Sequence, residues 1–128
     1  MSIVLDVVIE DSQLCYTWGT QKDKERRDRI RELIASKIED FSKEYIKQMV
    51  SKYNSLEVKL YFYCKRLEQD LDNLVKLTLD ALFYSARNEP GYNNWEHKIV
   101  SLEAKKFEAK GSKEKIEIKV IAWGKENS

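Results

Sequence analysis

Residues 56–82, LEVKLYFYCKRLEQDLDNLVKLTLDAL, contain the pattern that decides the fold of this chain. Leu56 to Tyr63 alternates apolar and polar side chains, which is the period of a strand with one buried face. From Leu71 onward the apolar positions recur at intervals of three and four residues, which predicts an amphipathic helix over Leu71 to Ser85. A strand, a short polar turn and a helix are therefore expected in succession.

The flanking sequence extends this order in both directions. The β-branched run Ile3 to Ile9 predicts a buried strand, and a polar loop follows over Glu10 to Thr20. Apolar spacing between Lys22 and Val50 predicts one long amphipathic helix. Two more strands are expected, Ile99 to Ala109 and Lys115 to Trp123, joined as a hairpin through the sequence KGSK. The order β-α-β-α-β-β predicts an α+β sandwich in which two helices cover a mostly antiparallel or mixed sheet.

The composition indicates one compact domain spanning residues 1–128. Hydrophobic residues make up 42% of the chain and charged residues 35%, with one proline and four glycines, and this length is enough to bury a single core. No apolar run approaches the roughly 20 residues that span a membrane. The first residues, MSIVLDVVIED, lack the basic start of a signal peptide. We therefore expect a cytoplasmic protein without membrane contact.

The cysteines and the histidine offer little toward a metal site on sequence grounds. Cys15 and Cys64 are few and far apart, and we expect free thiols, with Cys64 as a small apolar strand residue. His97 is the only histidine, which excludes a histidine-rich zinc site. It is expected to be a surface residue.

Oxygen ligands and a lysine gather at the start of the predicted helix. Asp70 stands at the N-cap position, and Asp72 falls in the first turn near the positive end of the helix dipole. Carboxylate oxygens suit Mg²⁺ or Mn²⁺, and Lys76, one turn beyond Asp72, is placed to reach a phosphate beside such an ion. An ordinary cap with a surface ion pair between Asp72 and Lys76 explains the same residues. The local pattern does not separate these two interpretations.

The same stretch resembles the core of the RusA family of Holliday junction resolvases. In that family a strand runs through a short polar turn into a DLDN-type motif, followed by a lysine and a DAL-type helix end. Here the corresponding segments are LEVKLYFYC, KRLEQ, Asp70 to Asn73, Lys76, and Asp80 to Leu82.

A second part of the resemblance lies downstream of the helix. Ile99 to Lys106, IVSLEAKK, resembles the family strand that follows an acidic loop residue and ends in a lysine. Counting back from it places Glu96 at the third carboxylate position, and Trp95 stands where family members often carry another acid.

The resemblance implies a metal-dependent endonuclease that resolves branched DNA by phosphodiester hydrolysis. Asp70, Asp72 and Glu96 would hold Mg²⁺ or Mn²⁺, and Lys76 would contact the scissile phosphate. The substrate would be double-stranded DNA with a four-way junction. Because such a junction has approximate twofold symmetry and needs paired cuts, a homodimer is expected.

The chain departs from the family pattern in ways that bear on DNA binding. Val4 to Trp18 contains no proline, where family members have a Pro-rich turn, and the turn before Asp70 has only Lys65 and Arg66 as basic residues. The net charge is only +1, although residues 105–125 hold seven lysines against three glutamates. A non-catalytic DNA-binding or assembly relative of the same fold, or a small interaction module, therefore stays open.

Three aromatic residues in loops or near the motif are candidates for stacking on unpaired bases. These are Trp18, Tyr92 and Trp95.

Overall fold

The computed structural model describes residues 2–15, 24–26, 28–37, 55–82 and 98–123. They include the strands β1 (Ser2–Asp11), β2 (Ser55–Cys64), β3 (Ile99–Glu108) and β4 (Glu114–Trp123), and the helix α2 (Leu71–Leu82). Residues 24–26 and 28–37 are also helical. The expected α+β fold and its element order are confirmed. The rest of the helix predicted over Lys22 to Val50, and residues 83–85 of the second helix, lie outside the described residues.

The strands form one mixed sheet in the order β1-β4-β2-β3. β4 pairs antiparallel with both β1 and β2, whereas β2 and β3 run parallel. Parallel neighbours need a crossover connection, and α2 lies in the one that joins β2 to β3.

The expected hairpin between the last two strands is wrong. β3 and β4 lie on opposite sides of β2, so the intervening residues 109–113 cross over the end of that strand. Two strand spacings amount to about 10 Å, which five residues span easily. Burial explains the arrangement, because β2 alternates regularly between buried and half-buried side chains and suits an interior position, whereas β3 is mostly exposed and suits the edge.

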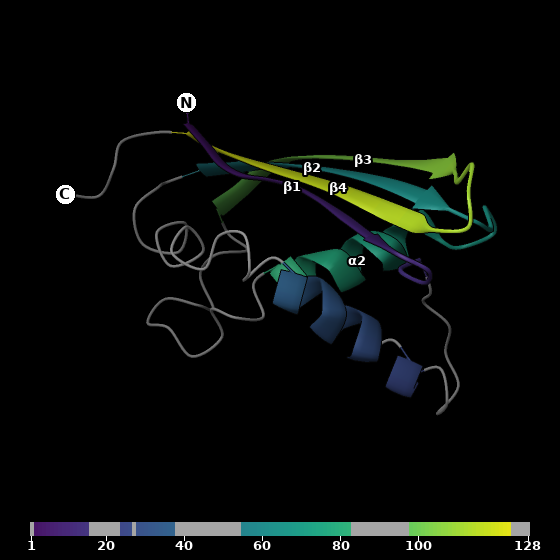
Figure 1. Cartoon of the computed structure of the whole chain (residues 1–128). Helices are drawn as coiled ribbons and strands as arrows, with labels where there is room; N and C mark the ends of the chain where they lie inside the picture. Colours follow the sequence, from purple (N-terminus) through teal and green to yellow (C-terminus); the bar gives the residue numbers. More distant parts are fainter. Residues whose placement is uncertain (1, 16–23, 27, 38–54, 83–97, 124–128) are drawn as a thin grey trace.

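The core lies on one face of the sheet. Figure 1 shows α2 and the helical residues 24–26 and 28–37 on the same side of it, in agreement with the expectation that helices cover one face. Phe62 in β2 is among the largest fully buried side chains. The helical contribution comes from Leu74, Ala81 and Leu82 of α2 together with Ile30, Ile34 and Ala35, all of which belong to one buried cluster with the strand residues.

The start of α2 agrees with its sequence. The backbone N–H of Leu74 donates to the carbonyl oxygen of Asp70 at 3.1 Å, which is the first bond of the helix and leaves Asp70 at the N-cap. The buried hydroxyl of Thr78 donates to the carbonyl oxygen of Leu74 at 2.8 Å and so has a partner inside the helix. Within the described ranges, no helix combines the length and the apolar character needed to cross a membrane.

Candidate functional site

Asp70 and Asp72 lie at the end of the sheet where β2 stops. Figure 1 shows the chain leaving the arrowhead of β2 and turning back into α2. Both aspartates are exposed, and the positive end of the helix dipole favours carboxylates at this place. Among the described side chains, neither belongs to a group of three or more close metal-ligating residues. Any ion held here would keep most of its ligands as water or substrate oxygens, as Mg²⁺ commonly does.

A lysine from the neighbouring strand fixes the turn that carries Asp70. Lys106 of β3 lies opposite Phe62 of β2, and its Nζ donates to the carbonyl oxygens of Leu67 and of Gln69, the latter at 2.6 Å. Hydrogen bonds from an ammonium group are stronger than those between neutral groups. Lys106 is the lysine at the end of the segment that resembles the family strand. The sequence therefore identified this residue but did not predict its contacts.

Lys76 lies in a polar groove between α2 and the other helical segment. The groove has a volume of about 310 Å³, and Asn73 and Asp80 line it from α2 together with Lys24, Asp28 and Arg31 from the opposite side. Asp28 and Arg31 form an ion pair at 3.5 Å. Among the ion pairs between described residues, none joins Lys76 to Asp72. The surface pair proposed as the ordinary interpretation is thus absent from the described part of the chain.

The third carboxylate, Glu96, lies outside the described residues, as do Trp18, Tyr92, Trp95 and His97. β3, which follows Glu96, begins at Ile99 opposite Leu56, whereas the turn to Asp70 leaves from Cys64. The eight-residue offset along β2 corresponds to about 26 Å of strand. The described geometry of the acidic site therefore rests on Asp70 and Asp72.

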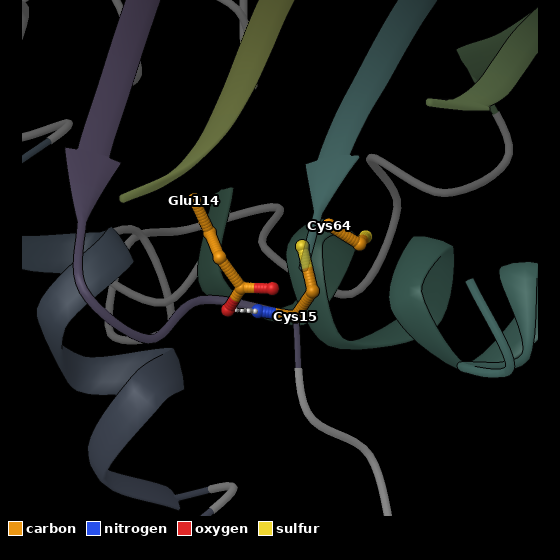
Figure 2. A group of neighbouring side chains, drawn as sticks. All are labelled: Cys15, Cys64 and Glu114. Carbon is orange, nitrogen blue, oxygen red and sulfur yellow. Dashed lines mark hydrogen bonds between the residues drawn. The ribbon is translucent and has the colours of Figure 1, made fainter. Parts of the chain in front are cut away.

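A second cluster of ligand-type side chains lies at the same end of the sheet. Cys15 follows β1, Cys64 ends β2, and Glu114 begins β4. Figure 2 shows the three together, and their ligand atoms all lie within 4.8 Å of one another. All three are buried, with exposed fractions of 4%, 0% and 5%. Both cysteines are free thiols, as expected, but the interpretation that they are too far apart to share a site is wrong.

The carboxylate of Glu114 is held by backbone amides from two other chain segments. Its Oε1 accepts hydrogen bonds from the N–H of Leu14 at 2.9 Å and of Cys15 at 3.0 Å, and its Oε2 accepts one from Lys65 at 3.0 Å. A buried carboxylate requires such partners, since an unpaired charge inside a protein is costly. Glu114 thereby ties the ends of β1 and β2 to the start of β4.

The two thiols differ in their readiness to lose a proton. Hydrogen bonding to Cys64 raises the pKa of Cys15, and burial and the nearby Glu114 raise it further. The same interaction lowers the pKa of Cys64 against the effect of burial, and the positive charge of Lys106 adds to this lowering. Cys64 is therefore the first of the pair to become a thiolate.

One sequence signal could have revealed this cluster. The alternation of β4 places Glu114 in phase with Ile116 and Ile118, so a carboxylate occupies a core-facing position at the strand start. A buried acid needs donors or a cation nearby. The adjacency of Cys15 and Cys64 depends on the strand order, which the sequence pattern does not determine.

Comparison of this chain with models of known protein families and with curated proteins finds no match.

Proposed function

We propose that the chain is a metal-dependent endonuclease that acts on branched DNA, with Asp70, Asp72 and Lys76 in its active site. The observation that carries the proposal is the placement of two exposed carboxylates on a helix start, with a lysine one turn beyond that is not paired with Asp72. A turn anchored by Lys106 holds this helix start in place. Glu96 stays a prediction of the resemblance to the RusA family, and the strand that follows it begins at the opposite end of β2 from the turn to Asp70.

The donor set at the helix start fits a hard divalent cation. The carboxylates of Asp70 and Asp72 would hold Mg²⁺ or Mn²⁺. When bound, such an ion activates water and stabilises the leaving oxygen in phosphodiester cleavage. Lys76 would contact the scissile phosphate and stabilise the charge that develops there. Lys106 positions the turn through the carbonyl oxygens of Leu67 and Gln69.

Basic side chains at this end of the sheet support a DNA partner. The N–H of Ala109 donates to the carbonyl oxygen of Cys64 at 2.8 Å, so the connection between β3 and β4 lies beside the end of β2. Lys110 and Lys113 in this connection are exposed. The sparse basic turn before Asp70 is thus supplemented by lysines from a distant part of the sequence, and phosphate binding depends on such local clusters more than on net charge.

A groove on the other face of the sheet favours DNA binding as a second candidate function without catalysis. It has a volume of about 920 Å³ and is lined by Tyr63 and Phe107 beside Lys110, Lys113 and Lys115. The two rings stack with centroids 5.1 Å apart, and Lys115 Nζ lies 4.3 Å from the centre of the Tyr63 ring. Phe107 is exposed and Tyr63 is half-buried. Accessible rings next to lysines are typical of surfaces that bind unpaired nucleotides.

Metal-dependent cleavage and stabilisation test the first proposal. We expect the full chain to cut a synthetic four-way junction in Mg²⁺ or Mn²⁺, and millimolar metal to raise its melting temperature because the ion binds only the folded state. Asp72→Asn should abolish cutting and weaken the shift, whereas Glu68→Gln, in the exposed turn before Asp70, should change neither. Junction binding without cleavage in either metal would instead support the DNA-binding relative.

The assembly state gives a separate prediction. We propose that the protein acts in the cytoplasm as a homodimer, because paired cuts across a four-way junction require two equivalent sites related by a twofold axis. Light scattering at micromolar concentration should therefore give twice the mass of one chain, with or without junction DNA. A monomer under both conditions would eliminate the resolvase version and leave a nuclease that makes single cuts.

A further inference from the structure

The cluster of Cys15, Cys64 and Glu114 has a geometry set by the sheet. Cys64 ends β2 and Glu114 begins β4, whereas Cys15 lies four residues beyond the end of β1, and the strand order brings all three to one end of the sheet. The pairing of β4 with β2 places Glu114 beside the end of β2, and the N–H of Cys15 donates to Glu114 Oε1 at 3.0 Å, which holds the segment after β1 next to them. The three ligand atoms already lie within 4.8 Å of one another.

This separation is close to that in a bound zinc site. With Zn–S bonds of about 2.3 Å and tetrahedral angles, two sulfurs around zinc are about 3.8 Å apart, and Zn–O bonds are about 2.0–2.2 Å. The ligand atoms would therefore move together by about 1 Å at most on binding. Two thiolates are soft ligands that select zinc over Mg²⁺, so this cluster and the exposed aspartates differ in the metal they prefer.

The carboxylate of Glu114 retains the capacity to bind an ion. A carboxylate has roughly four lone-pair sites, and three are used by the amides of Leu14, Cys15 and Lys65. The remaining site is on Oε2, for which the described part of the chain supplies one backbone donor, the N–H of Lys65. Hydrogen bonds of this kind hold a metal-binding carboxylate in one orientation, as is usual around protein-bound metals.

A cavity gives the cluster access from solvent. It has a volume of about 250 Å³ and is lined by Cys15 and Glu114 together with Gln69, Lys65 and Arg66. We propose that Cys15 Sγ, Cys64 Sγ and Glu114 Oε2 bind one zinc ion, with water from this cavity in the fourth position. Both thiol protons pass to solvent on binding. The assembly of two thiolates, one carboxylate and Zn²⁺ has a net charge of −1, which the nearby Lys106 and Lys65 offset.

The ion would join the end of β2, the start of β4 and the segment after β1 at the base of the turn that leads to Asp70. The proposal concerns zinc binding and its effect on stability, and it does not depend on the nuclease activity. Zinc should stabilise the folded chain by mass action because the unfolded chain lacks a preformed site.

Cobalt and zinc titrations of the full chain test the site. Reduced, metal-free protein should bind one Co²⁺ with thiolate-to-cobalt charge-transfer absorption and the visible bands of tetrahedral cobalt, and one equivalent of Zn²⁺ should remove both. Free Zn²⁺ at about 100 times the dissociation constant should raise the melting temperature by on the order of 5–10 °C.

Variants decide which residues hold the ion. Cys15→Ala and Cys64→Ala should each abolish the charge-transfer band and the zinc shift, and they are preferred to Glu114 variants because Glu114 also supports the backbone. Asp72→Asn and Glu108→Gln should leave both signals intact.

Three outcomes would overturn the proposal. The first is a wild type with two reduced thiols and no cobalt band, and the second is a band that survives either cysteine variant. The third is a protein that binds no metal when reduced but forms a Cys15–Cys64 disulfide with oxidised glutathione. That result would indicate a redox pair.

Discussion

Replacing Lys76 with alanine is expected to slow cleavage of a four-way junction by a factor of about 10² or more, as loss of one preorganised charge contact typically does. Lys76 is exposed in a groove, one helical turn beyond Asp72, and among the described residues it forms no ion pair with Asp72. Its positive charge is therefore available for a phosphate oxygen. Single-turnover cleavage at saturating enzyme measures the chemical step directly.

Binding and cleavage should separate in this variant. Junction affinity should fall little, because several Lys and Arg side chains share the phosphate contacts and removing one changes the salt dependence by about one unit of slope. Lys24→Ala, from the same groove but on the opposite helical segment, is the matched control and should cut at the wild-type rate. Unchanged cleavage by Lys76→Ala would remove Lys76 from the active site and leave it as a surface residue whose replacement changes stability by less than about 0.5 kcal/mol.

The elements of the fold could be predicted from periodicity because burial follows it closely. The alternation over Leu56 to Tyr63 became β2, which is longer by one residue at each end, and the spacing after Leu71 became α2, which begins at the expected residue. The order of the strands in the sheet was harder to predict. A short link between two alternating strands favours a hairpin, yet here β2 lies between β3 and β4. The order depends on which strands pair with a neighbour on both sides and which lie at the edge of the sheet. That arrangement is a property of the whole sheet.

The two candidate sites differ in how far the sequence could predict them. Asp70, Asp72 and Lys76 lie within seven residues, so one helix start brings them near one another, and the N-cap position of Asp70 is confirmed. Cys15, Cys64 and Glu114 span 100 residues of sequence, and only the pairing of β4 with both β1 and β2 brings them together. Local spacing carries no information about such pairing.

Glu114→Gln is expected to lower the free energy of unfolding by about 3 kcal/mol or more, although the two side chains have nearly the same shape. The carboxylate accepts three amide hydrogen bonds, with both oxygens engaged. In glutamine one oxygen becomes an NH₂ group, so at least one backbone N–H faces another donor instead of an acceptor. Hydrogen bonds to a charged acceptor contribute roughly 1.5–3 kcal/mol each, and a buried donor left unpaired adds its own desolvation cost.

Urea unfolding in the presence of a chelator measures this effect apart from any bound metal. Glu117→Gln is the matched control, since Glu117 lies on the same strand but is partly exposed and pairs with Lys115 at 3.5 Å. Loss of that ion pair should cost less than about 1 kcal/mol. Because a domain of this size is stable by only about 5–15 kcal/mol, the Glu114 variant should unfold at a distinctly lower urea concentration. Equal losses in the two variants would show that the amide contacts of Glu114 do not stabilise the junction of β1, β2 and β4.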